Sequence, residues 1–271
     1  MKKLGYLSKL YRYPVKSMSG EELESVMVSK KGLVGDRSYA LIDTQTNKIV
    51  SAKNPKKWPN IFMYSSKYLL EPTENKISNI QIKIPNRNEV ILSSQEEIDE
   101  ILSASLNRSV KLTSIVPKKV QLEEYSPDID NHAVKGIIAD AKMADNTFFD
   151  LGTIHIITTA TISKLKEIYP KGDFNINRFR PNIVIDLDQN EIGFVENEWV
   201  GQKIAIGNEV VLKIKEHCPR CVMTTLEQHD ISKDINILKT IKKSNNGNLG
   251  IYADVIQMGH IKKNDLIKII N

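Results

Sequence analysis

The two cysteines of the chain lie close together, in the segment Cys218-Pro219-Arg220-Cys221. A chain of 271 residues with two cysteines has no disulfide framework, which indicates a reducing compartment. A neighbouring guanidinium favours the thiolate form of a cysteine, and the thiolate is the form that binds soft metals or carries sulfur. The spacing alone is equally consistent with two structural thiols and with a thiol used in redox or metal chemistry.

Two more specific roles for the cysteine pair are disfavoured. A zinc site needs more ligands, but the chain has no second C-x-x-C and no histidines at ligand spacing. A thioredoxin-like dithiol opens a helix, whereas residues 222–226 (Val-Met-Thr-Thr-Leu) look extended. A single thiolate, acting as a metal ligand or a sulfur carrier, remains the chemical alternative to two structural thiols.

Arginines form a second candidate group in residues 178–182 (Arg-Phe-Arg-Pro-Asn). On an extended chain, Arg178 and Arg180 point to the same side, which predicts a bidentate grip on an anion beside the amide of Asn182. Two solvated surface charges are the more common fate of such arginines and stay open as the alternative.

A third group lies near the N-terminus, in residues 13–17 (Tyr-Pro-Val-Lys-Ser) and 35–37 (Gly-Asp-Arg). Lys16 and Ser17 offer an ammonium and a hydroxyl to a phosphate, and Arg37 adds a guanidinium. Each fragment taken alone is more typical of an ordinary turn than of a phosphate site.

Strands must position these groups, because short runs of alternating apolar and polar residues dominate the chain. In the first half, such runs cover residues 4–13, 38–43, 49–52, 80–84 and 90–92. In the second half, six further runs cover residues 154–157, 183–185, 203–206, 210–215, 251–256 and 266–270. The pattern predicts a mainly β fold of the α+β class, with a β-barrel-like second domain.

Three helices are predicted between these strands. Ser94 and Glu97 have the spacing of a capping box, ahead of a helix whose apolar face begins at Ile98. Two further helices are expected over residues 161–169 and 231–243. Residues 117–144 are charged and lack a clear period, so we interpret them as the boundary region between two domains.

Composition narrows the class of ligand. The formal net charge of +5 suits an anionic small molecule or an acidic partner, but it is too small to indicate a nucleic-acid binder. No apolar stretch is long enough to span a membrane, and Lys9 and Arg12 interrupt the N-terminal run that a signal peptide would need. We expect a cytoplasmic protein that binds neither nucleic acid nor membrane.

Taken in order, the Tyr-Pro-Val-Lys-Ser, Gly-Asp-Arg, Arg-Phe-Arg-Pro-Asn and Cys-Pro-Arg-Cys-x-x-Thr-Thr segments resemble the MOSC family, and most of all its amidoxime-reducing branch. The resemblance covers nearly the whole chain. It implies an N-terminal β-barrel-like domain over residues 1–115 and a MOSC domain over residues 116–271. It also implies a molybdenum cofactor, Mo-molybdopterin, and the family is further described as binding pyridoxal phosphate.

The resemblance also implies roles for particular residues. Cys221 matches the cysteine that ligates molybdenum and is thereby the catalytic residue. The other positions expected at the cofactor are Lys16, Ser17, Arg37, Thr159, Arg180, Asn182, Cys218, Arg220 and Tyr252. A soft metal in a phosphate-bearing pterin cofactor calls for such a thiolate and such cations.

The implied function is a molybdenum-dependent oxidoreductase that reduces N-hydroxylated or other N-oxygenated small molecules. The chain has no cysteine cluster for an iron–sulfur centre, so electrons are expected from a separate flavin or iron–sulfur protein. Residues 226–230 depart from the Asp-Pro loop usual in the family, which leaves the substrate range open. A carrier of sulfur or cofactor, with Cys221 as the thiol, and a catalytically idle interaction protein are the alternatives.

Overall fold

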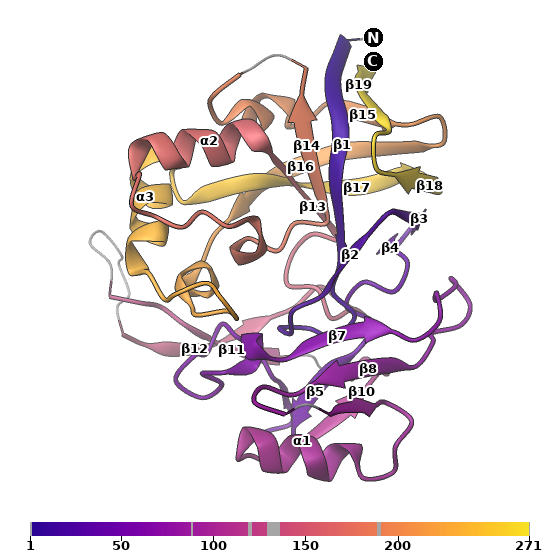
Figure 1. The fold of residues 1–271 in the computed structure, drawn as a ribbon, viewed down its shortest axis with the longest axis vertical. Coiled ribbons are helices and arrows are strands. Elements are labelled where there is room, and N and C mark those ends of the chain that lie inside the picture. Colours follow the sequence, from indigo (N-terminus) through magenta and orange to yellow (C-terminus); the bar gives the residue numbers. More distant parts are fainter. Residues whose placement is uncertain (1, 88, 119–120, 129–135, 189–190, 271) are drawn as a thin grey trace.

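The computed structural model describes residues 2–87, 89–118, 121–128, 136–188 and 191–270. Figure 1 shows two β-rich parts, an upper one that carries two helices on its flank and a lower one that carries a third. The predicted mainly β fold with a few helices is confirmed.

The upper part is a closed barrel of seven strands, as far as the described residues show, because strand β14 at one end of the sheet also pairs with β1, which lies next to the strand at the other end. In order around the barrel, the strands are β14 (Ile183–Leu187), β13 (Ile154–Thr158), β17 (Asn248–Gln257), β16 (Val210–Pro219), β15 (Lys203–Ile206), β19 (Leu266–Ile270) and β1 (Lys2–Arg12). Alternate apolar side chains, such as Ile204 and Ile206 of β15, fill its interior. All six strands predicted for the second half belong to this barrel.

Strand β1 belongs to the barrel although it is the first strand of the chain. It runs antiparallel to both β14 and β19, and its Leu7 and Leu10 are fully buried in the barrel core. Strand β2 (Glu21–Leu23) pairs with the C-terminal end of β1. Ladders therefore join the start of the chain to its end, and the division at residue 115 stays a prediction.

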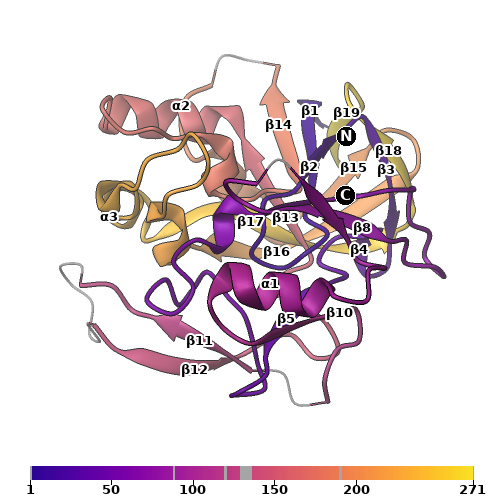
Figure 2. The same cartoon turned by 60° about the horizontal axis from the view of Figure 1, so that its bottom comes forward.

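The lower part contains smaller sheets around a second apolar core. Its five-stranded sheet runs in the order β10 (Val110–Thr113), β5 (Ala40–Asp43), β6 (Lys48–Ile49), β11 (Gln121–Tyr125) and β12 (Ile138–Lys142). A three-stranded sheet of β7 (Ser65–Tyr68), β8 (Ile80–Lys83) and β9 (Val90–Leu92) belongs to the same part. The other three-stranded sheet, of β18 (Gly259–Lys262), β3 (Ser25–Ser29) and β4 (Gly32–Leu33), packs against the barrel core instead, through residues such as Val28 and Ile261. The predicted boundary region thus contains the β11–β12 hairpin, which projects from the lower part in Figure 2.

All three predicted helices are present. They are α1 (Ile98–Leu106), α2 (Thr159–Ile168) and α3 (Ile235–Asn245), with short 3-10 helices η1 (Ile61–Met63), η2 (Ile176–Arg178), η3 (Val195–Trp199) and η4 (Val222–Thr225). The predicted capping box of α1 is wrong, because Glu97 occupies the N-cap and no side chain caps the helix. Helices α2 and α3 lie together on one flank of the barrel, where Leu165 and Ile241 share an apolar cluster (Figures 1 and 2).

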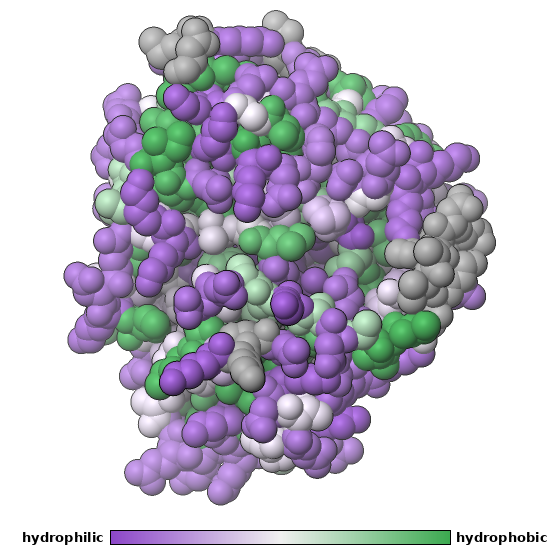
Figure 3. All heavy atoms as spheres, turned by 180° about the vertical axis from the view of Figure 1, so that it is seen from behind, coloured by the Kyte–Doolittle hydropathy of each residue, from purple (hydrophilic) through white to green (hydrophobic). Residues whose placement is uncertain are grey.

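The face seen from behind is dominated by hydrophilic side chains, with small separate apolar patches (Figure 3). Among the described helices, none combines the length and the apolar character that crossing a bilayer would require.

Candidate functional site

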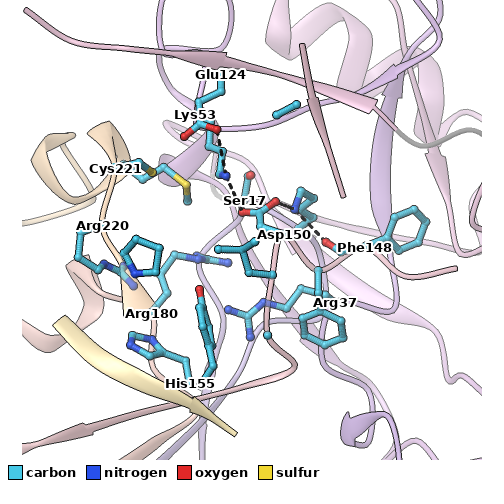
Figure 4. A pocket seen from close by; sticks show the side chains of 18 of the residues that line it. Ser17, Arg37, Lys53, Glu124, Phe148, Asp150, His155, Arg180, Arg220 and Cys221 are labelled. Carbon is cyan, nitrogen blue, oxygen red and sulfur yellow. Dashed lines mark hydrogen bonds and ion pairs between the residues drawn. The ribbon is translucent and has the colours of Figure 1, made fainter. Parts of the chain in front are cut away.

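A cavity of about 360 Å³ is lined by residues from both parts of the molecule (Figure 4). Lys16 and Ser17 follow β1, Cys221 follows β16, and Tyr252 lies on β17. The volume is within the range of small-molecule sites, which commonly lie where two parts of a fold meet.

The structure brings most of the predicted site residues to this cavity. Those that line it are Lys16, Ser17, Arg37, Arg180, Asn182, Arg220, Cys221 and Tyr252. Cys218 is fully buried beside the lining residue Arg220. Thr159 is not at the cavity: it begins α2, and its hydroxyl donates to Asp186 over 2.8 Å.

The predicted joint grip of Arg178 and Arg180 on one anion is wrong. Arg178 ends η2 instead of lying on an extended chain, and it donates to the backbone carbonyls of Leu226 and Ser232. Arg180 has a positive φ of 53°, which turns its side chain toward the cavity (Figure 4). Its guanidinium lies 4.1 Å from the ring centroid of Tyr13, and burial lowers its pKa to about 10. Only Arg180 is therefore available to a ligand.

Asn182 connects the barrel to Arg37, which lines the same cavity. Its Nδ2 donates to Oδ2 of Asp36 over 2.8 Å, and its Oδ1 accepts from the backbone N–H of His155 over 3.1 Å. Asp36 is buried and forms an ion pair with Arg37. The Asn182 amide is thus committed to protein partners, and it positions Arg37 through Asp36.

Asp150 lies between two lysines that also line the cavity (Figure 4). Its Oδ1 is 2.5 Å from Nζ of Lys16, and its Oδ2 is 3.6 Å from Nζ of Lys53. Burial alone would raise the pKa of Asp150, but the charges of the two lysines hold it well below its usual range. Lys53 also pairs with Glu124 over 3.4 Å. The Asp150 carboxylate therefore holds the ammonium groups of Lys16 and Lys53 in place.

The two cysteines have different environments. Cys221 lines the cavity as the N-cap of η4, and burial raises the pKa of its thiol, with Lys53 acting in the opposite direction. Cys218 accepts a hydrogen bond from Nη1 of Arg220 over 2.8 Å. Burial would raise the pKa of Cys218 as well, but the charges of Arg220 and His155 lower it to about 6. The extended chain predicted after Cys221 is wrong, because residues 222–225 form a 3-10 turn.

Arg220 keeps its Nε donor free for a ligand. Its Nη1 donates to Cys218 and its Nη2 to the backbone carbonyl of Phe179 over 2.9 Å. Its Nε is buried, and among the described residues it has no hydrogen-bond partner. A buried donor without a partner is costly, which favours a ligand acceptor at this position.

Positive charge dominates the lining. Six cationic side chains, from Lys16, Arg37, Lys53, Lys142, Arg180 and Arg220, face two carboxylates, those of Glu124 and Asp150. The described part of the chain holds no group of three or more metal-ligating side chains. The arrangement suits an anionic ligand, and a metal here would take Cys221 together with ligands that come from outside the protein.

Sequence patterns did not indicate several lining residues. Lys53 follows a predicted strand with no motif around it, Asp150 follows the aperiodic boundary region, and His155 is a single histidine on a strand. All three come to the site through long-range pairing of the chain. The ion pair of Asp150 with Lys16, for example, joins residues 134 positions apart.

The fold and the site define a β-barrel protein with a cationic cavity and one thiol facing into it. The family model of the MOSC N-terminal beta barrel domain matches residues 4–111, and that of the MOSC domain matches residues 144–268. The chain therefore belongs to the MOSC-domain family, and its predicted N-terminal β-barrel domain is confirmed.

Individual proteins are similar to the chain at lower coverage or identity. Molybdenum cofactor sulfurase of Bombyx mori is 32% identical over 118 residues, which are 41% of this chain and 13% of that protein. Mitochondrial amidoxime reducing component 2 of Rattus norvegicus is 24% identical over 238 residues, 84% of this chain and 68% of that protein. The solved structure of the YUAD protein of Bacillus subtilis covers 98% of this chain and 96% of its own at 9% identity, with a TM-score of 0.47.

Proposed function

We propose that the cavity binds the molybdenum cofactor, Mo-molybdopterin, with Cys221 as the thiolate ligand of the metal. The observation that carries the proposal is one thiol facing a cavity in which cations outnumber carboxylates six to two. The names of the relatives, a molybdenum cofactor sulfurase and an amidoxime reducing component, support the same assignment.

The residues present fit such a group. Lys16, Arg37 and Arg180 supply cations for its anionic groups, and Nε of Arg220 supplies the free donor. A thiolate is a suitable ligand for a metal that dithiolene sulfurs already hold, and the bound cofactor supplies the two-electron chemistry. Asp150 keeps Lys16 and Lys53 in place and limits the positive charge of the cavity.

The reaction we propose is reduction of an N-hydroxylated or other N-oxygenated small molecule. The N–O bond breaks, two electrons and two protons are consumed, and the oxygen leaves as water. The electrons come from a separate flavin or iron–sulfur protein, because the chain has two cysteines in total. The cytoplasmic location stays a prediction.

Molybdenum content is the direct test. Purified from a host that makes the cofactor, the wild-type protein should contain molybdenum and Cys221→Ser should lose it. Thr159→Val is the matched control, because Thr159 lies away from the cavity, and it should keep the metal. A wild-type protein without molybdenum, or full retention in Cys221→Ser, would contradict the proposal.

A carrier of sulfur or cofactor is the second candidate, favoured by the 32% identity to the sulfurase. Two measurements separate it from the reductase. Reduction of benzamidoxime by the loaded protein, with electrons from reduced benzyl viologen, supports the reductase. A persulfide on Cys221 in the mass spectrum, without turnover of benzamidoxime, supports the carrier.

A further inference from the structure

A second cavity, of about 450 Å³, shares one lining residue, Arg180, with the candidate cofactor cavity. Its walls come from β1 and β2, from the start of η2, and from the turn at residues 228–231. No residue proposed above to ligate the metal lines it. The two cavities are thus separate spaces on either side of one guanidinium.

The inner end of this cavity differs from its mouth. Tyr11, Tyr13, Arg180, Gln228 and Ile231 are all buried, and they give the inner end flat apolar surfaces and two kinds of nitrogen donor. The mouth is polar and exposed, with Lys9, Glu22, His229 and Asp230 around it. A ligand with one acceptor group and a small apolar body would match this polarity.

Gln228 supplies the first independent sign of a ligand. The residue is 3% exposed, and its Nε2 is buried without a hydrogen-bond partner among the described residues. Leaving such a donor unpaired costs about 1–3 kcal/mol, so buried donors are almost always paired in folded proteins. Gln228 does not line the first cavity, so a cofactor bound there would leave this donor unpaired.

Arg180 supplies the second independent sign of a ligand. It is 7% exposed, donates from Nη1 to the backbone carbonyl of Met18 over 2.6 Å, and has no carboxylate partner in the part of the chain that the structure describes. The phenol of Tyr13 beneath it is not a counter-ion, because burial raises its pKa to about 12. A guanidinium carries five N–H donors, enough to serve an acceptor in each cavity.

The turn that carries Gln228 is held rigidly. The backbone N–H groups of Gln228 and Ile231 each donate to the other residue's carbonyl, over 2.9 and 2.7 Å. His229 adopts a positive φ of 43°, and its Nε2 lies 3.1 Å from Oγ of Ser19. Such strained, fixed backbone is typical of binding sites, because it orients a donor before the ligand arrives.

We propose that this second cavity binds a small organic carboxylate. Its oxygens accept hydrogen bonds from the Gln228 amide and the Arg180 guanidinium, and its apolar body lies against Tyr11, Ile176 and Ile231. A single negative charge fits better than a phosphate, because the carboxylates of Glu22 and Asp230 stand at the mouth and Lys9 is already 4.0 Å from Glu22.

Calorimetric titration of the full chain with sodium benzoate tests the proposal. Wild-type protein should bind benzoate, and Gln228→Leu, which keeps the size of the side chain, should bind it about tenfold more weakly. Gln45→Leu makes the same change in an exposed turn and should bind like wild type. Because Gln228→Leu removes an unpaired buried donor, the thermal unfolding temperature of the variant without ligand should be at least that of wild type. Gln228→Glu, which adds a repelling charge, should abolish binding.

Two further variants distinguish this cavity from the cofactor site. Benzoate binding should persist in Cys221→Ser, whether or not the wild-type protein contains molybdenum, so a failed cofactor proposal leaves this one standing. It should also persist in Lys16→Met, since Lys16 lines the first cavity and not the second. The proposal would be overturned if wild-type protein did not bind benzoate, or if Gln228→Leu bound it as tightly as wild type. Loss of benzoate binding in Lys16→Met, with binding retained in Gln228→Leu, would also overturn it.

Discussion

Arg220 donates a hydrogen bond to the sulfur of Cys218 over 2.8 Å, so the arginine between the two cysteines contacts the first of them. The same contact helps to lower the pKa of the buried Cys218 thiol to about 6. Cys221 is left to face the cavity. The two thiols of a symmetric-looking segment therefore have separate tasks, one fixing a guanidinium inside the protein and the other open to a ligand.

Cys218 should make stability depend on pH in the cofactor-free protein. The folded-state pKa lies below the unfolded one, so the unfolded chain binds more protons between pH 6 and 9. The difference in unfolding free energy between wild type and Cys218→Ser should therefore grow with pH across this window, on the order of 1 kcal/mol per pH unit. Guanidinium chloride titrations in reducing buffer at several pH values measure it.

The matched control is Cys221→Ser. Burial raises the pKa of Cys221, so its thiol is neutral in both states below pH 8. The difference between this variant and wild type should stay flat from pH 6 to pH 8. A flat profile for Cys218→Ser as well would mean that Arg220 does not hold a thiolate.

Asp150→Asn should leave two lysines without their shared counter-ion and destabilise the protein by about 2–4 kcal/mol. Asp145→Asn, the same change at an exposed position five residues earlier, should have almost no effect. Because the pKa of Asp150 is held well below its usual range, its stabilisation is present above about pH 4 and is lost as the pH falls further. Urea unfolding at pH 7 and pH 3.5 tests both statements, and equal losses in the two variants would contradict them.

The unfolding free energy should fall much more on replacing Arg178 by methionine than on replacing Arg180 by methionine. Arg178→Met leaves the buried carbonyl of Leu226 and the carbonyl of Ser232 without their donor, and should lower the unfolding free energy by about 2–4 kcal/mol. Arg180→Met removes a buried charge that has no carboxylate partner among the described residues, so we expect little loss of stability. Chemical denaturation measures the unfolding free energies of both variants. A larger loss in Arg180→Met than in Arg178→Met would contradict the prediction.

Gly250→Ala should displace His155, a residue that lines the candidate cofactor cavity. A Cβ at this position would lie 2.5 Å from Nε2 of His155 and 2.5 Å from the carbonyl oxygen of Ile156, and the φ of 77° adds strain. We expect a loss of about 2–5 kcal/mol in unfolding free energy. Gly201→Ala, with a φ of 85° and no neighbouring atom within 4 Å, isolates the backbone strain and should lose about 1–2 kcal/mol. Similar losses in both variants would exclude a role for the contact with His155.

Local patterns were sufficient for the seven barrel strands and the three α-helices among the described residues, because alternation and the 3.6-residue period are local properties. They did not predict the short strands β7 and β10 or the β11–β12 hairpin. They were insufficient for the closure of the barrel, which depends on pairing of β1 with β14 and β19. The same limit applies at the site. Cys221 and Arg180 stand in recognisable segments, whereas Asp150 and Lys53 have no local signal and meet through the packing of distant parts.

The pairing of β1 with β19 also affects the order of folding during synthesis. β1 precedes the other barrel strands in the described residues, and its partner β19 follows them, so β1 is synthesised well before β19. The edge of β1 that pairs with β19 therefore stays unpaired until residues 266–270 have been synthesised, whereas β2 and β14 become available to β1 earlier. The barrel can therefore close only after residues 266–270 are available, so its folding cannot be completed while most of the chain is being synthesised.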